Sequence, residues 1–120
     1  MSEKNKSVVE RINAAFARND VEGFLALCAD DFEWTMVGDK PVKGKDAIRK
    51  WMAGAPPEPP QFTIDTVLAD GDYVTCIGSM TMSENGKVVP YAYCDVWRFR
   101  GEKPAELKAF VIKTDRASGS

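Results

Sequence analysis

Residues 88–99 read VVPYAYCDVWRF, an alternating run that predicts one long β-strand. Side chains alternate between the two faces of a strand, so one face here carries three aromatic rings and a carboxylate: Tyr91, Tyr93, Asp95 and Trp97. Water-facing surfaces rarely carry so many rings, and packed cores rarely contain an unpaired acid. We therefore interpret this face as the wall of an apolar pocket into which Asp95 projects.

The segment before this strand predicts three helices. Ser7 followed by Glu10 is typical of a capping box, which predicts a helix over residues 8–18. Asp20 is expected to cap a second, short helix. A third helix is expected over residues 44–54, because apolar side chains recur there at helical spacing.

Strand patterns dominate the remainder of the chain. Residues 32–36 alternate in polarity and predict a short strand, and residues 55–60 contain four prolines and read as a stiff connection. The apolar period then changes to two, which predicts strands at about 62–69, 73–83, 87–99 and 106–114. Asn85-Gly86 predicts a hairpin between two of these strands, because both residues tolerate positive φ.

This order of elements predicts an α+β fold, with three N-terminal helices packed in a strongly curved, mostly antiparallel sheet. A curved sheet wrapped around helices forms a cone with an apolar interior, which the ring-bearing face of residues 88–99 would line. A chain of 120 residues has the length of one domain. We assign residues 1–115 to that domain and residues 116–120 to a tail.

Composition restricts the classes of function. The net charge is −2 with mixed signs throughout, and no apolar run has membrane-spanning length. The sequence therefore predicts neither nucleic-acid binding nor a membrane segment, and we expect a cytoplasmic protein. The absence of histidine excludes Ser-His and Cys-His nucleophile systems and most zinc or iron sites. We expect no metal and no cofactor, and we expect Cys28, Cys76 and Cys94 to be reduced thiols.

Three stretches resemble a known superfamily: DVEGFLALCADD at 20–31, VKGKDAIRKW at 42–51 and YCDVWRF at 93–99. In their order and spacing they resemble NTF2-like proteins, and among these the ketosteroid isomerase and SnoaL-like polyketide cyclase group. The resemblance implies a cone-shaped NTF2-like fold with a small hydrophobic carbonyl or polyketide-like ligand in its interior. It also implies isomerase- or cyclase-type chemistry without a cofactor, and a homodimer formed through the outer face of the sheet.

The resemblance carries over to the catalytic positions only in part. Asp95 matches an aspartic acid that the isomerase keeps protonated, so that it donates a hydrogen bond to the substrate oxygen. The isomerase's general base falls on Met36, or on Thr35 if the gap is placed differently, and its helix tyrosine falls on Ile12. Tyr93 lies two residues from Asp95 on the same face, and we hypothesise that it partly replaces the missing tyrosine. The predicted catalytic residues are therefore Asp95 and Tyr93.

The remaining large inward side chains are predicted to contact the ligand, with core packing as the alternative for each one. They are Trp34, Met36, Trp51, Cys76, Met80, Tyr91, Trp97 and Phe110. Gly78 on the same face either leaves room for a ligand or permits curvature of the sheet. Asp95 itself has a structural alternative, in which a tyrosine hydroxyl or Lys108 of the last strand satisfies its carboxylate.

Three functions fit these observations. The first is an enzyme that uses Asp95 as an acid or base on a small hydrophobic carbonyl compound. The second resembles limonene-epoxide hydrolase, in which an aspartate–arginine–aspartate set activates water, although Tyr93 occupies the position of that arginine. The third is a non-catalytic ligand-binding or dimerising module of the same fold.

Overall fold

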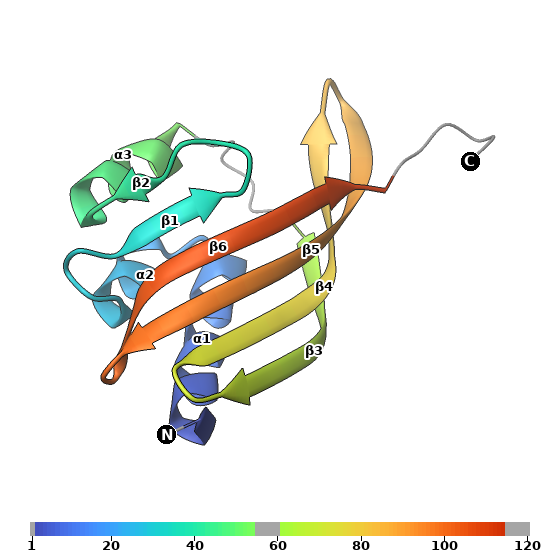
Figure 1. The fold of residues 1–120 in the computed structure, drawn as a ribbon. Helices are drawn as coiled ribbons and strands as arrows, with labels where there is room; N and C mark the ends of the chain where they lie inside the picture. Colours follow the sequence, from blue (N-terminus) through green and yellow to red (C-terminus); the bar gives the residue numbers. More distant parts are fainter. Residues whose placement is uncertain (1, 55–60, 115–120) are drawn as a thin grey trace.

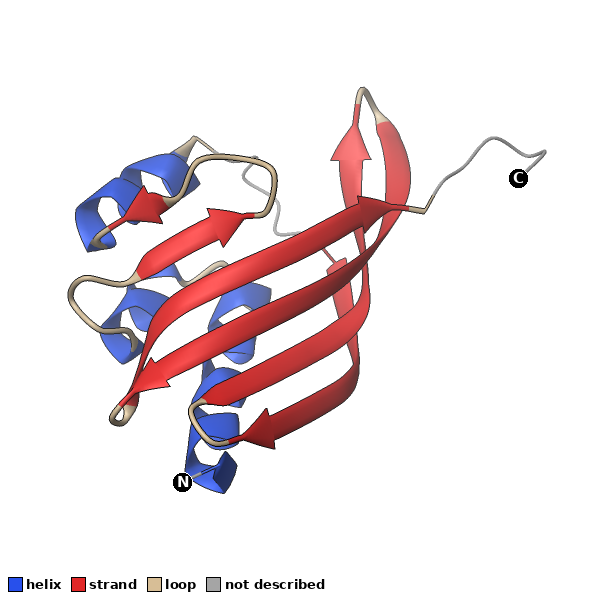
Figure 2. Ribbon diagram, in the orientation of Figure 1, coloured by secondary structure: helices blue, strands red, loops and turns tan. Residues whose placement is uncertain are grey.

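The computed structural model describes residues 2–54 and 61–114, in which three helices cover one face of a six-stranded sheet (Figure 1). The helices are α1 (Ser2–Ala17), α2 (Val21–Leu27) and α3 (Lys45–Ala53). The strands are β1 (Glu33–Met36), β2 (Val42–Lys43), β3 (Gln61–Asp70), β4 (Tyr73–Glu84), β5 (Lys87–Arg100) and β6 (Lys103–Lys113). We call the face toward the helices the inner face and the opposite one the outer face (Figure 2). The predicted connection at 55–60 and the tail at 116–120 lie outside the described residues.

The strand order in the sheet is β2-β1-β6-β5-β4-β3. Every neighbouring pair is antiparallel except β1 and β6, which are parallel. This arrangement confirms the predicted α+β fold with a mostly antiparallel sheet. The two-residue strand β2 was not predicted; it pairs with β1 through Trp34 and Val42 and adds an edge beside α3.

The helix starts were predicted with mixed success. Asp20 caps α2 as predicted, and its side-chain oxygen accepts a hydrogen bond from the Gly23 backbone N–H at 2.9 Å. The capping box at Ser7 was wrong, because α1 already begins at Ser2. The extra turn carries Asn5, which is buried, so packing stabilises a helix start that has no local sequence signature.

The β4–β5 hairpin places β5 in the sheet. Asn85 and Gly86 adopt positive φ values of 52° and 79°, as the two-residue turn requires. From this turn the strands pair without interruption as far as Tyr73 opposite Arg98. The inner face of β5 therefore carries the alternating side chains that the sequence predicted.

A bulge in β6 shifts its pairing with β5 by one residue. Phe99 pairs with Pro104, whereas the next residue, Arg98, pairs with Glu106, so Ala105 is an extra residue in β6. One extra residue reverses the faces of everything that follows it. Lys108 and Phe110 consequently lie on the outer face, where Phe110 is 41% exposed. The predictions that Phe110 lines the interior and that Lys108 can reach Asp95 were wrong.

Aromatic rings fill the interior between the helices and the sheet. Trp97 is completely buried, and its ring centroid lies 6.0 Å from that of Phe32 and 6.4 Å from those of Phe16 and Phe24. This part of the cone is a packed core, which leaves Trp97 no free surface for a ligand. No helix among the described residues combines the length and the apolar character needed to cross a membrane.

Gly78 lies where two strands approach unusually closely. A Cβ atom at this position would lie 2.0 Å from the backbone oxygen of Thr63 and 2.9 Å from the hydroxyl of Tyr93. β3 has an irregular register between Ile64 and Thr66, next to this contact. The space above Gly78 is therefore filled by the protein itself, which favours a role in sheet shape over room for a ligand.

We predict that Gly78→Ala lowers the free energy of unfolding by about 1–3 kcal/mol, the usual cost of an overpacked core position. The added methyl group collides with the Thr63 backbone, which cannot rotate away as a side chain would. Urea denaturation measures the difference. The matched control is Gly54→Ala, where the nearest atom to a Cβ is 3.6 Å away and φ is −84°. Equal stability of the two variants would contradict a steric role for Gly78.

Candidate functional site

Asp95 lies on the inner face at the level where the packed core ends. Its direct neighbours across the sheet are Cys76 on β4 and Ala109 on β6, and Met36 on β1 follows in the same row beyond Ala109. Cys76 and Ala109 are buried, whereas Met36 and Asp95 are partly exposed. The carboxyl group is therefore partly exposed at the edge of the buried core.

The carboxyl group of Asp95 has no counter-charge. Among the described residues it forms neither a hydrogen bond nor an ion pair, and Lys108 lies on the opposite face of the sheet. Burial alone raises the pKa of Asp95 from its usual range near 4 to about 7. At neutral pH the protonated and ionised forms are then present in comparable amounts, which suits a group that takes up and releases protons.

Tyr93 directs its hydroxyl group away from Asp95. The Tyr93 side chain extends over Gly78, and its hydroxyl donates a hydrogen bond to the backbone oxygen of Thr63 on β3 at 3.4 Å. Burial, and then the proximity of Asp95, raise the pKa of this phenol, so it remains protonated at neutral pH. Tyr93 therefore supports the curved part of the sheet in this structure, and its suggested role in place of the helix tyrosine stays a prediction.

Four of the other residues predicted to contact a ligand lie near Asp95. Met36 and Cys76 lie in the row of Asp95, and Met80 faces Tyr91 across β4 and β5 closer to the hairpin. These four side chains and Asp95 share the inner face.

The tryptophans lie elsewhere. Trp34 extends the aromatic core from β1, and its ring meets that of Trp51 on α3 at 5.1 Å, where Trp51 is 43% exposed. Among the described residues the indole nitrogens of Trp34 and Trp97 are buried without a hydrogen-bond partner. The tryptophans belong to the core and its edge, next to the Asp95 row and not within it.

Asn13 of α1 is a polar neighbour of this row that the sequence analysis missed. Its side chain is only 9% exposed and donates to the thiol sulfur of Cys76 at 3.9 Å. Burial raises the pKa of Cys76 to about 11, so the thiol stays neutral. The available signal was a polar residue next to the apolar stripe of Val9, Ile12 and Phe16, because such a residue turns toward the interior as well.

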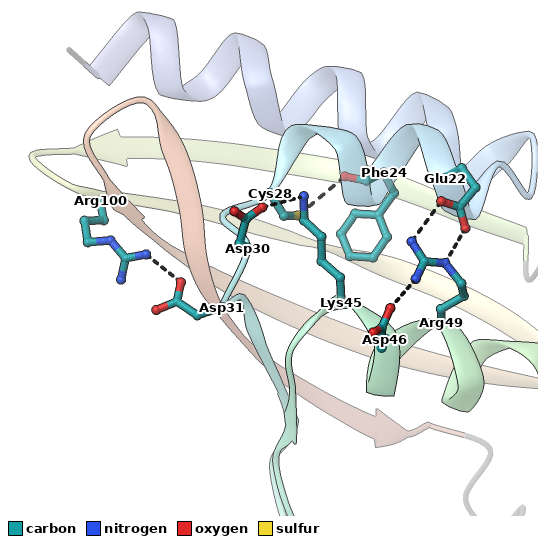
Figure 3. A network of polar contacts seen from close by, with 9 residues as sticks. All are labelled: Glu22, Phe24, Cys28, Asp30, Asp31, Lys45, Asp46, Arg49 and Arg100. Atoms are coloured by element: carbon teal, nitrogen blue, oxygen red, sulfur yellow. Dashed lines mark hydrogen bonds and ion pairs between the residues drawn. The ribbon is translucent and has the colours of Figure 1, made fainter.

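A second polar region lies at the turn between β5 and β6, where charges pair with one another (Figure 3). Arg100 donates to Asp31 at 2.5 Å, and Lys45 approaches Asp30 at 3.4 Å. These groups border a shallow hollow of about 570 Å³. Among the charged residues on its walls, Arg100 pairs with Asp31, Glu102 with Lys4 and Asp30 with Lys45. Within the described part of the chain only Lys103 on these walls has no partner of opposite charge, and one exposed cation does not make a catalytic group. No three potential metal ligands converge anywhere in residues 2–54 and 61–114.

Residues 9–107 match the SnoaL-like domain. The chain belongs to the SnoaL-like family. No match is found among curated proteins. The family assignment confirms the resemblance inferred from the sequence.

Solved structures agree with this assignment at the level of fold. An NTF2-like protein of unknown function from Burkholderia pseudomallei is 23% identical with a TM-score of 0.83, and the match covers 91% of this chain and 90% of that one. A provisionally assigned ketosteroid isomerase from Kribbella flavida is 14% identical with a TM-score of 0.79, covering 97% and 83%. A provisionally assigned SnoaL-like polyketide cyclase from Jannaschia sp. CCS1 is 14% identical with a TM-score of 0.81, covering 92% and 86%. This SnoaL-like protein therefore has the NTF2-like fold.

We predict that Asp95 makes the stability of this SnoaL-like protein depend on pH. Its pKa in the folded state, about 7, lies above the unfolded value of about 3.9, so the folded state binds the proton more tightly. The free energy of unfolding should therefore fall as pH rises from about 4 to about 7, with a slope approaching 1.4 kcal/mol per pH unit. Urea denaturation between pH 5 and pH 8 measures this slope.

The matched variants are Asp95→Asn, which should remove this part of the slope, and Asp70→Asn at an exposed position, which should retain it. A ¹³C NMR titration of the carboxyl carbon gives the pKa of Asp95 directly. A titration midpoint near 4 would show that the carboxyl group is solvated and would contradict a pKa raised by burial.

Proposed function

We propose that this SnoaL-like protein binds a small hydrophobic carbonyl or polyketide-like compound beside Asp95. In this proposal Asp95 performs acid/base chemistry of the isomerase or cyclase type without a cofactor. The observation that carries it is the Asp95 carboxyl group itself, which is unpaired among the described residues and has a pKa raised to about 7. A partly buried acid that loses hydration without gaining a structural partner reduces stability, so a functional role is the simplest reason for its presence.

The row of residues around Asp95 offers one group that changes charge near neutral pH, because burial raises the pKa of the Cys76 thiol to about 11. Met36, at the position of the isomerase's general base, lies beyond Ala109 in the same row and carries no proton. A reaction that one carboxyl group can perform is proton transfer between two carbons of an enolisable ketone. Ionised Asp95 removes a proton from the carbon next to the carbonyl, and the resulting acid returns a proton to another carbon, so that no net proton is consumed.

The apolar surroundings define the ligand class. Met36, Met80 and Tyr91 share the inner face with Asp95, and no cationic side chain of the described residues pairs with the acid. Such a surface favours a flat, uncharged ring system over a phosphate or a carboxylate. The names of the similar structures, an isomerase of ketosteroids and a cyclase of polyketides, fit ligands of this kind.

The bicyclic ketone 1-tetralone tests the proposal. We expect the wild type to accelerate the exchange of its α-hydrogens for deuterium in D₂O, by up to the factor of about 10²–10⁴ that general acid–base catalysis supplies. Asp95→Asn should abolish the acceleration, because an amide neither takes up nor releases the proton. ¹H NMR follows the exchange.

The same samples separate binding from chemistry. Thermal shift with 1-tetralone should show a stabilised wild type, and Asp70→Asn serves as a variant that alters charge without altering the inner face. Stabilisation accompanied by identical exchange rates in the wild type and Asp95→Asn would remove the catalytic half of the proposal and leave a binding module. An absence of both effects would refute the proposal as a whole.

We also propose that two copies associate through their outer sheet faces. Ile77, Cys94 and Phe110 form one outer row across β4, β5 and β6, and Ile77 and Phe110 are each 41% exposed. Ile112 and Leu68 are also exposed on this face. Contiguous apolar surface of this kind on a globular protein commonly marks an interface.

We predict that the wild type sediments as a dimer and that Ile77→Lys sediments as a monomer. A lysine at the centre of a self-complementary face brings two charges together in an apolar environment. Analytical ultracentrifugation measures the state. The control is Val88→Lys, a substitution of a more exposed residue near the end of the β4–β5 hairpin, which should remain dimeric. A monomeric wild type would exclude this interface.

A further inference from the structure

A hollow opens between helix α1 and strand β3. Its volume is about 360 Å³, and its walls include Glu10, Asn13, Ala14 and Ala17 from the helix and Phe62 and Ile64 from the strand. None of the residues that we predicted to contact a ligand is part of these walls.

The spacing along α1 explains why the hollow exists. Asn13 and Ala14 lie three and four residues after Glu10, and Ala17 lies four and three residues after them, so all four form one stripe on the helix. Two members of this stripe are alanines, whose short side chains do not fill the space toward β3. Phe62 and Ile64 provide an apolar wall on the other side.

Asn13 is the buried one of three polar residues on the walls of the hollow, the others being the exposed Glu10 and Gln61, and it has spare hydrogen-bonding capacity. A carboxamide offers two N–H donors and an oxygen that accepts, and buried side chains of this type normally have good partners. Among the described residues the only partner of Asn13 is the Cys76 sulfur at 3.9 Å, a long contact to a weak acceptor. The side chain is 9% exposed, so this unused capacity is held inside the protein.

Asn13 also connects the hollow with Asp95. It contacts Cys76, and Cys76 is the direct cross-strand neighbour of Asp95 on the inner face. The walls of the hollow include Asn13 but neither Cys76 nor Asp95, so a ligand seated there has to extend past the carboxamide to reach the carboxyl group. The described residues offer no ion pair at either group that the ligand would have to break.

We propose that the hollow between α1 and β3 is the ring-binding part of the ligand site, and that Asn13 positions the ligand by a hydrogen bond to its oxygen. This inference rests on the proposed function, because it assumes a ligand that reaches Asp95. It adds the location of the apolar body and a second polar contact. The ligand class is a flat, uncharged ring of one or two cycles that carries a carbonyl or enol oxygen.

The first experiment blocks the hollow without altering Asp95. Ala14 is exposed, so Ala14→Phe fills the space beside Phe62 while leaving the core intact. We expect the dissociation constant of 1-tetralone, measured by titration calorimetry, to rise at least tenfold. Ala26→Phe, the same substitution at an exposed position of α2, should leave it unchanged.

The second experiment tests the hydrogen bond of Asn13 with a matched pair of probes, 1-tetralone and tetralin, which lacks the oxygen. Asn13→Leu should weaken binding of the ketone by about three- to tenfold relative to tetralin, the effect of one hydrogen bond. A purely structural role of Asn13 would change both affinities by the same factor. Asn5→Leu, which replaces the other buried asparagine of α1 away from the walls of the hollow, should preserve the ratio.

The outcomes distinguish this inference from the proposed function. If the wild type does not bind 1-tetralone, or if Asp95→Asn leaves binding and exchange unchanged, the proposed function fails. Asp95→Asn could weaken the binding of 1-tetralone while Ala14→Phe and Asn13→Leu both leave its affinity unaltered. In that case the ligand reaches Asp95 by another route, and this inference is overturned.

Discussion

A single extra residue in β6 determines the surroundings of Asp95. Without the bulge at Ala105, the register from Phe99 opposite Pro104 would place Lys108 beside Asp95 and Phe110 beside Tyr93. The bulge moves both side chains to the outer face and brings the small Ala109 next to the acid. The carboxyl group consequently lacks a cation that would have held it ionised, and its raised pKa depends on that lack. The same shift places the Phe110 side chain on the apolar outer face.

The position of the acid limits what its burial costs. Two residues further along β5, Trp97 is completely buried among phenylalanine rings. A carboxylate at the position of Trp97 would be far more difficult to accommodate. Asp95 retains partial exposure, so it can be ionised without unfolding the protein. Tyr93 forms its hydrogen bond to Thr63 on the other side, and Gly78 makes that contact possible. The packed core and the curved sheet thus hold a titratable group at their common boundary.

Local signals predicted the fold, and long-range pairing limited the prediction of the site. Asp20 and Asn85-Gly86 act within a few residues, so capping and turn rules were sufficient. The inner position of Asp95 followed from alternation alone. Phe110 was misplaced because Ala105, neither glycine nor proline, gives no local sign of a bulge. The start of α1 at Ser2 and the role of Asn13 depend on packing between the helix and the sheet, which no local pattern records.

The site around Asp95 differs from a two-acid arrangement in a way that has chemical consequences. With Met36 where a second ionisable group would stand, the proposed reaction requires Asp95 alone to remove and return a proton, so its pKa must lie close to the working pH. Desolvation brings the pKa of Asp95 to about 7 without the help of a second charge, which meets this condition. What one carboxyl group cannot supply is orientation of the substrate oxygen, because it is occupied with the proton. In the proposed site the carboxamide of Asn13, one contact away through Cys76, is neutral at every relevant pH and would orient a carbonyl without disturbing that pKa. The proposed function thus divides proton transfer and positioning between two elements, the former on β5 and the latter on α1.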